Sequence, residues 1–186
     1  SGLRVGMTNT DGVHVNGRQT DSGDCSGPKS ARNVLMHPEV DAAVFETARG
    51  GMLREGLGFD RCQVAVVTNI GAGDHLGLNF ITTVEDLAVL KRVIVQNVAD
   101  DGYAVLNATD PNVARMAAVC PGSVIYFAAD AQQPVLATHR AQGLRCVFIE
   151  DGHIVAAEGS WRERVALRDV PLTRNGSIGF QVENAM

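Results

Sequence analysis

Several classes of protein are excluded by what the 186-residue sequence lacks. It has no apolar stretch long enough to span a bilayer, and its first residues, SGLRVGMTNT, have neither the charge nor the apolar run of a secretory signal. Sixteen basic and 21 acidic residues give a mild net charge of −5 and form no basic block. We therefore expect neither a membrane nor a nucleic acid as partner.

The cysteine spacing excludes two further classes. The four cysteines, at positions 25, 62, 120 and 146, include no C-x-x-C pair. This spacing predicts neither a zinc framework nor a disulfide scaffold, and it is typical of a reducing cytoplasm. We found no repeats and no low-complexity linker.

What the sequence does contain is a series of short apolar strands that alternate with helices. We predict strands in LRVGMTNT, VDAAVFE, CQVAVVTN, YAVLN and SVIYFAA. We predict helices in SGPKSARNVLMH, from a capping box at Thr82-x-x-Glu85 to about Asn97, and in DPNVARMAAVC. This alternation indicates the α/β class, with an open, mainly parallel sheet flanked by helices.

The alternation of strands and helices ends near residue 143. Beyond it, two predicted strands surround Asp151-Gly152, a typical hairpin signal. We expect one domain, with a parallel α/β part at 1–142, a β-hairpin part at 143–175 and the start of another helix at 176–186. Because the chain stops at IGFQVENAM, we expect it to be a piece of a longer protein.

One segment imitates a phosphate-binding loop. GDCSGPKS differs from the pattern G-x-x-x-x-G-K-[ST] by one residue, because Pro28 replaces the second glycine. Proline has no N–H group to donate to a phosphate. The preceding HVNGRQTDS is also a poor central strand, so we predict a turn that leads into a capped helix.

Glu46 is the first candidate site residue, because it ends the strand DAAVFE and precedes TARGG. Open α/β sheets bind ligands at the carboxyl ends of their strands, and a carboxylate there can bind Mg²⁺. The alternative is that Glu46 forms a structural ion pair with Arg49 or Arg54. The motif alone leaves both interpretations open.

His75 and Lys91 are the second and third candidates. His75 lies in NIGAGDHLGL, a glycine-rich loop just beyond a predicted strand, and a lone histidine there can also be structural. Lys91 interrupts the apolar stripe of the following helix. It either extends its amine to solvent or stays neutral, and a neutral lysine can react with carbon dioxide to give a carbamate, which is an oxygen ligand for a cation.

These motifs and several others resemble, in order, the central domain of the Mur ligase family, ATP-dependent enzymes that join an amine to a carboxylate. The segments are VGMTNTDGVHVNG, GDCSGPKSARNVL, ETARGGMLREGLGFDRC, VVTNIGAGDHLGL, YAVLNATDP and VPLTRNGSIGFQVENA. ETARGG together with DHLGL resembles most closely the branch that adds arginine to the aspartate side chains of a poly-aspartate backbone.

The resemblance implies a role for each matching residue. Glu46 would bind magnesium, and His75 with a carbamylated Lys91 would complete a second magnesium site beside the reaction. Asn184, in the family's NA segment, would contact ATP. Thr10, Asp11 and Arg49 are candidate substrate-binding residues near the acceptor.

The chain also departs from the family pattern. In the family, a phosphate-binding loop precedes the segment that matches VGMTNTDG, and a C-terminal lobe follows the segment that matches QVENAM. Neither part is among these 186 residues. The NIGAGDH loop is also one residue longer than the common version. We therefore expect the isolated fragment to be inactive and to form homo-oligomers through exposed sheet surface. Another Mur-type peptide ligase and a non-catalytic α/β binding module remain as alternatives.

Overall fold

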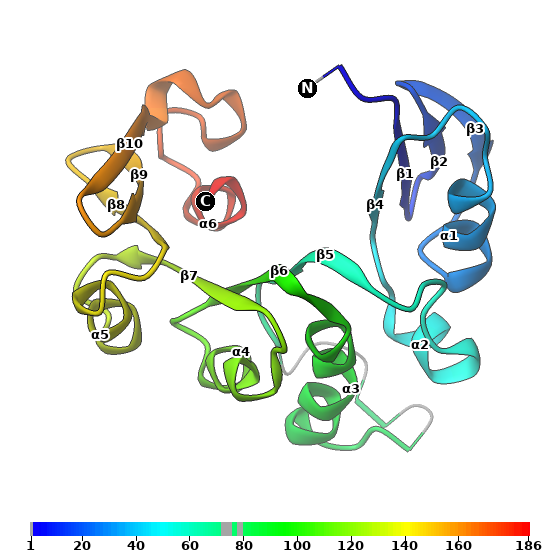
Figure 1. Ribbon diagram of the computed structural model, residues 1–186, viewed down its shortest axis with the longest axis horizontal. Helices are drawn as coiled ribbons and strands as arrows, with labels where there is room; N and C mark the ends of the chain where they lie inside the picture. The colour runs from blue at the N-terminus through cyan, green and yellow to red at the C-terminus, as the bar shows by residue number, and fades with distance from the viewer. Residues whose placement is uncertain (1, 72–75, 78–79) are drawn as a thin grey trace. The chain divides into compact units, whose positions relative to one another are not determined.

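Figure 1 shows the computed structural model, which describes residues 2–71, 76–77 and 80–186. The chain divides into two compact units, residues 1–61 and 62–186, and each has its own sheet. The first unit contains β1 (Val5–Asn9), β2 (Gly12–Val15), β3 (Arg18–Ser22), α1 (Pro28–Leu35), β4 (Ala42–Phe45) and α2 (Arg49–Glu55).

The sheet of the first unit has the strand order β3-β2-β1-β4. β1 is antiparallel to β2 and parallel to β4, so the carboxyl ends of β1 and β4 meet at one edge of the sheet. β3, with the sequence RQTDS, is exposed along its whole length at the other side. Its polar residues suit an edge position and explain why this segment reads as a poor central strand.

α1 packs on this sheet through its apolar face. Val13, Cys25 and Val34 are buried together, and Val40, Ala43 and Phe45 pack against them. Pro28 occupies the first turn of α1, as predicted from the sequence, because a proline there forfeits no helical hydrogen bond. The expected side-chain cap is absent: Gly27 occupies the N-cap position and forms no side-chain hydrogen bond.

The second unit contains the longer sheet. Its elements are β5 (Cys62–Val67), α3 (Val84–Gln96), β6 (Val98–Asn107), α4 (Pro111–Ala114), η1 (Arg115–Val119), β7 (Ser123–Asp130), α5 (Pro134–Ala141), β8 (Cys146–Glu150), β9 (His153–Glu158), β10 (Trp161–Ala166), η2 (Leu167–Asp169), η3 (Pro171–Thr173) and α6 (Gly179–Ala185).

Six strands of the second unit follow the order β10-β9-β8-β7-β6-β5. The pairs from β5 to β8 are parallel, whereas β9 and β10 add antiparallel strands. Asp151 and Gly152, with φ values of 48° and 70°, form the turn between β8 and β9. Positive φ at both positions is typical of a type I′ turn, so the predicted hairpin is confirmed.

The N-cap of α3 lies one residue later than the sequence predicts. The N-cap is Thr83, whose hydroxyl accepts a hydrogen bond from the Asp86 backbone N–H, while the Asp86 carboxylate accepts from Thr83 N–H. The predicted pair Thr82 and Glu85 does not form this capping box. Aspartate at the third helical position therefore replaces the glutamate that the usual pattern favours.

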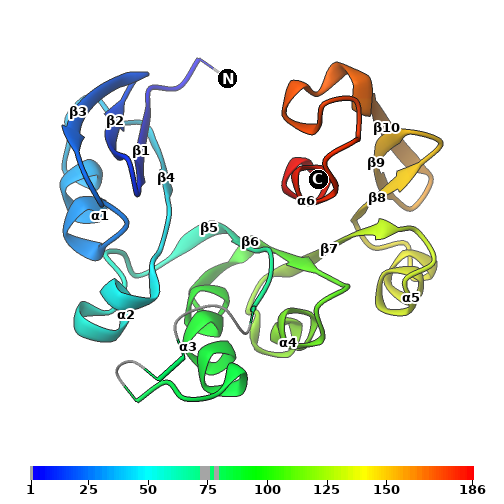
Figure 2. The same ribbon diagram turned by 180° about the vertical axis from the view of Figure 1, so that it is seen from behind.

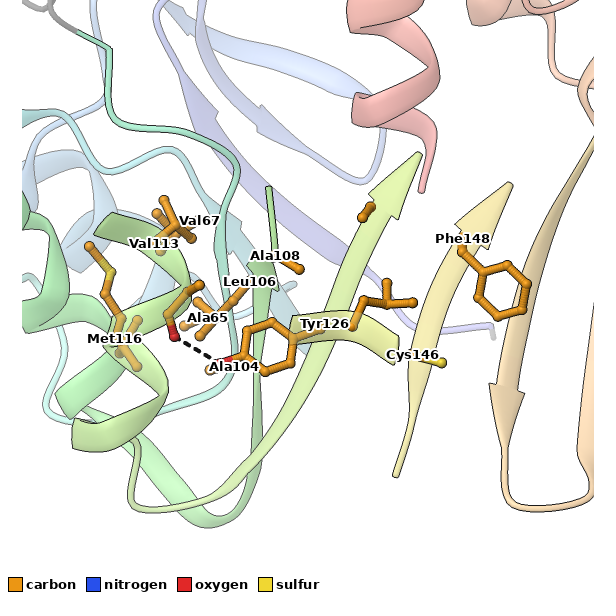
Figure 3. Packing of buried hydrophobic residues seen from close by; sticks show 14 of the residues in the cluster. Ala65, Val67, Ala104, Leu106, Ala108, Val113, Met116, Tyr126, Cys146 and Phe148 are labelled. Atoms are coloured by element: carbon orange, nitrogen blue, oxygen red, sulfur yellow. Dashed lines mark hydrogen bonds between the residues drawn. The ribbon is translucent and has the colours of Figure 1, made fainter. Parts of the chain in front are cut away.

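The core of the second unit lies between the sheet and the helices α3, α4 and α5 (Figure 3). Leu87, Leu106 and Phe148 are fully buried there. Tyr126 lies among the same residues, and its hydroxyl donates a hydrogen bond of 2.8 Å to the Ala114 carbonyl. This bond satisfies the one polar atom of the Tyr126 side chain.

The α/β class with an open, mainly parallel sheet flanked by helices is thus confirmed. Among the described residues, no helix combines the length and the apolar character that crossing a membrane requires.

Candidate functional site

Three loops gather at the carboxyl edge of β1 and β4 in the first unit. Hydrogen bonds between backbone groups join them: Cys25 N–H donates to Asn9 (3.0 Å), Glu46 N–H to Thr8 (2.9 Å) and Ala48 N–H to Ser26 (3.1 Å). The loop that imitates a phosphate-binding loop therefore lies between the turn after β1 and the start of α2. Strand ends of this kind are the usual ligand positions of open α/β sheets.

Glu46 occupies the position that the sequence predicts, directly after β4. Its side chain is exposed, and Oε2 accepts a hydrogen bond of 3.1 Å from the Thr10 backbone N–H. Thr10, Asp11 and Glu46 are therefore brought to the same edge. An exposed carboxylate held by a backbone donor has the oxygen ligands and the negative charge that Mg²⁺ requires.

Asn9 shapes the turn that presents Thr10. Its Oδ1 atom accepts hydrogen bonds from the backbone N–H groups of Asp11 and Gly12, both at 3.0 Å. This is an Asx turn, in which an asparagine side chain satisfies the backbone two and three residues later. Because the turn holds residues 10–12, it also holds the Thr10 donor on Glu46.

A third carboxylate at this edge, Asp24, was not identified from the sequence. Oδ1 of Asp24 accepts from the Ser26 hydroxyl at 2.5 Å and from the Ser26 backbone N–H at 3.1 Å. These bonds, above all the one from the hydroxyl, lower the pKa of Asp24 below its usual 3.8. The sequence D-x-S before a helical proline is the signal that could have identified it.

Arg49 is the first residue of α2, in the same unit as Glu46, and is half-buried. The other candidates belong to the second unit. Lys91 lies on α3, partly buried, four residues after the fully buried Leu87. Asn184 lies exposed on α6, where its amide donates to Gln181 Oε1 at 3.4 Å.

His75 lies outside the described residues. The magnesium roles of Glu46 and of the pair His75 and Lys91 therefore stay predictions. Within the ranges 2–71, 76–77 and 80–186, no cluster of three or more His, Cys, Asp or Glu side chains has the arrangement of a metal site.

The loop that leads to His75 is anchored at its start. Asp110, the N-cap of α4, accepts a hydrogen bond of 2.7 Å from the Ile70 backbone N–H, and its other carboxylate oxygen caps the helix at Asn112 and Val113. This carboxylate joins the carboxyl ends of β5 and β6. The sequence predicts a helix in DPNVARMAAVC but does not indicate this second role of Asp110.

Comparison with known proteins gives closely similar relatives along the whole chain. Cyanophycin synthetase of Synechocystis sp. is 45% identical over 188 aligned residues, and that of Geminocystis herdmanii is 43% identical. The alignments cover 100% of this chain but 21% of each relative. The chain thus spans about a fifth of the length of these relatives.

A solved structure shows the same fold. A UDP-N-acetylmuramoyl-L-alanyl-D-glutamate–2,6-diaminopimelate ligase superposes with a TM-score of 0.63 at 17% identity, over 88% of this chain and 33% of that one. The sequence pattern of the Mur ligase middle domain also matches residues 3–155, which is most of the chain. The chain therefore belongs to the Mur ligase middle-domain family.

Proposed function

We propose that residues 1–186 form the middle domain of a cyanophycin synthetase, an ATP-dependent carbon–nitrogen ligase. In this proposal the longer protein adds arginine to the side-chain carboxylates of a poly-aspartate backbone, the cyanophycin primer. ATP would phosphorylate an aspartate side chain, and the arginine amine would then displace phosphate from the acyl phosphate through a tetrahedral intermediate.

One observation carries the proposal at the level of the site. Glu46 directly follows the strand β4, is exposed to solvent, and accepts a hydrogen bond from the Thr10 N–H group at the edge where the three loops meet. The similarity to cyanophycin synthetases extends along the whole chain and so includes this edge. A ligase site is favoured over a passive binding module because of this similarity along the whole chain.

Each candidate residue has a separate task in this scheme. Glu46 would hold a magnesium ion, which when bound would neutralise charge on the ATP phosphates. Thr10 would orient the Glu46 carboxylate, Arg49 would bind the reacting carboxylate of the acidic acceptor, and Asp11 would lie in the loop beside the acceptor.

The remaining candidates act on the nucleotide and the acyl transfer. Asn184 would contact ATP. His75 and Lys91, with Lys91 carbamylated, would hold a second magnesium ion beside the reacting carboxylate. The sequence contains no G-x-x-x-x-G-K-[ST] motif, so other parts of the longer protein would supply the phosphate-binding loop and complete the amino-acid site. The 186-residue fragment alone would then be inactive.

The test replaces Glu46 by glutamine in the longer protein and measures ATP-dependent incorporation of labelled arginine into a poly-aspartate primer. Glutamine keeps the size of the side chain and removes the charge that binds the cation. We expect roughly a 100-fold loss of incorporation, about 3 kcal/mol of lost stabilisation. The loss should become smaller as the magnesium concentration rises.

Glu39→Gln is the matched control, because Glu39 is also an exposed carboxylate of the first unit but lies away from the three-loop edge. It should retain incorporation within about 2-fold. Replacing arginine by lysine or another amino acid in the assay identifies the amine substrate. Preference for an amine other than arginine would indicate a different Mur-type ligase, and unchanged activity of the Glu46→Gln variant would exclude the metal role.

A further inference from the structure

Three arginines of the second unit gather around one buried aromatic ring. The guanidinium carbon of Arg140, on α5, lies 4.9 Å from the centre of the Phe148 ring, and α5 lies beside β8 in both views (Figures 1 and 2). On β10, Arg164 pairs with Val155 of β9, which in turn pairs with Phe148, and directly paired residues point to the same face of a sheet. Arg162 lies two positions before Arg164 and shares this face. We call Arg140, Arg162 and Arg164 the arginine cluster.

The carboxylates beside the arginine cluster neutralise it only in part. Oε2 of Glu150 lies 3.3 Å from Nη1 of Arg162, and Oδ2 of Asp151 lies 3.8 Å from Nη2 of Arg164. Both distances exceed the roughly 2.7–2.9 Å of a strong charge-assisted hydrogen bond. Among the residues that the structure describes, Arg140 forms no ion pair. Three guanidinium groups and two carboxylates therefore leave an excess of positive charge here, although the whole chain has a net charge of −5.

Packing orients the guanidinium groups of the cluster. Phe148 is fully buried, and the negative face of an aromatic ring attracts a guanidinium group that lies over it, as that of Arg140 does. Burial raises the pKa of the Cys146 thiol, and the charges of Arg140 and Arg162 oppose that rise, so both charges lie near the same buried atom. β10 is the edge strand at the end of the sheet opposite to β5, the strand that directly follows the first unit. The cluster therefore presents oriented N–H donors at a sheet edge.

We propose that the arginine cluster binds side-chain carboxylates of an acidic polypeptide, the acceptor chain of the ligase, at a second site beside the three-loop edge of the first unit. The identity of this partner rests on the proposed function, in which the acceptor carries successive aspartate carboxylates. A guanidinium group has a planar fork of donors that matches a carboxylate, and an extended peptide advances about 3.3–3.6 Å per residue, so a few aspartates can reach several of these donors. Glu150 and Asp151 would repel the denser charge of a nucleic acid.

The test measures binding of a fluorescein-labelled poly-aspartate peptide to the 186-residue chain by fluorescence anisotropy. Arg140→Gln should weaken binding about 5-fold, because it removes a charge and its donor fork. Arg18→Gln is the matched control: it removes the same charge from the exposed strand β3 and should bind within about 2-fold of the unsubstituted chain, because salt screens a charge outside the cluster. Asp151→Asn should tighten binding about 3-fold, since it removes a repelling charge and asparagine suits the φ of 48° at this turn position. A folding defect could not produce this gain.

Three results would overturn the proposal: equal affinity of Arg140→Gln and the unsubstituted chain, weaker binding by Asp151→Asn, or equal affinity for a DNA oligonucleotide of the same charge. The last would show that the cluster attracts anions in general. In the longer protein, Arg140→Gln should act on the KM for the poly-aspartate primer, raising it about 5-fold, rather than on kcat. Because binding of the peptide needs neither ATP nor turnover, its failure is distinguishable from failure of the Glu46→Gln test of the proposed function.

Discussion

The backbone N–H of Thr10 donates a hydrogen bond of 3.1 Å to Oε2 of Glu46 and so joins the turn after β1 to the end of β4. The two residues are 36 positions apart in the sequence and meet because β1 and β4 are parallel neighbours. A side-chain substitution at Thr10 leaves this donor in place. The orientation of the Glu46 carboxylate therefore depends on the residues that fix the backbone of the turn.

Asn9→Ala tests this dependence. Alanine removes the Oδ1 acceptor that satisfies the N–H groups of Asp11 and Gly12, so the turn loses two hydrogen bonds. We expect the free energy of unfolding to fall by about 1–2 kcal/mol and hydrogen exchange at residues 10–12 to become faster. Urea unfolding and amide exchange measure these effects. Asn9→Asp keeps the acceptor and should lose less than half as much, and equal losses would contradict the role of the side-chain oxygen.

Acid should release the ion pair between Arg4 and Asp41. The two guanidinium N–H donors lie 2.9 and 3.0 Å from the two carboxylate oxygens, and the Arg4 backbone N–H adds a third bond at 2.9 Å. The hydrogen bonds from the Arg4 side chain are the largest cause that lowers the pKa of Asp41 from 3.8 to about 2. This folded-state pKa lies below the unfolded value, so the pair stabilises the fold fully above pH 4 and is lost as the pH falls toward 2.

An NMR titration of the Asp41 carboxyl carbon measures this shift directly. In Arg4→Ala the pKa of Asp41 should rise most of the way to its ordinary value, because the guanidinium donors are absent. Arg18→Ala is the control, since Arg18 is exposed on the edge strand β3. A midpoint near 4 for Asp41 in the unsubstituted chain would show that the pair does not form in solution.

The sequence predicted those elements whose signals are local. The apolar strands, Pro28 at the start of α1 and the Asp151-Gly152 turn each depend on residues within a few positions, and all three are confirmed. No helix was predicted for residues 134–141, where α5 forms. Its N-cap, Gln133, is not a usual capping residue, and its amide donates to the Ala108 carbonyl at 2.6 Å, a contact that no local pattern encodes.

The same distinction applies to the candidate site. Glu46 and Thr10 could be predicted to share an edge, since both follow strands of a parallel sheet. Asp24 could also have been predicted from the local D-x-S pattern, whereas the second role of Asp110 could not, because it depends on the contact that Ile70 makes after folding. From the sequence alone, a carboxylate in a loop is predicted only to be an exposed polar residue, because the loop that contacts it is not known.

Thr83→Ala distinguishes the observed cap of α3 from the one that the sequence suggests. Alanine removes the oxygen that accepts from Asp86 N–H at 3.0 Å, and the loss of an N-cap typically costs about 1 kcal/mol of stability. Glu85→Ala should cost less than about 0.5 kcal/mol, because Glu85 is not part of the capping box. Urea unfolding of the two variants decides between them, and a larger loss from Glu85→Ala would favour the original pairing.

Gly122→Ala should be among the most destabilising single-methyl additions in the second unit. A Cβ atom at Gly122 would lie 2.4 Å from the Gly102 carbonyl oxygen and 2.6 Å from that of Ala99. Both oxygens belong to the backbone of β6, which pairs with β7 directly after Gly122, so neither can move without disturbing the sheet. We expect a loss of roughly 2–3 kcal/mol in the free energy of unfolding.

Gly179→Ala is the matched control for this prediction. It adds the same methyl group at the first residue of α6, where no atom lies within 4 Å of the added carbon. Alanine favours helix over glycine, so this variant should be neutral or slightly more stable. If chemical denaturation gave the two variants equal stability, β6 and the start of β7 would lie farther apart in solution than the register of their pairing requires.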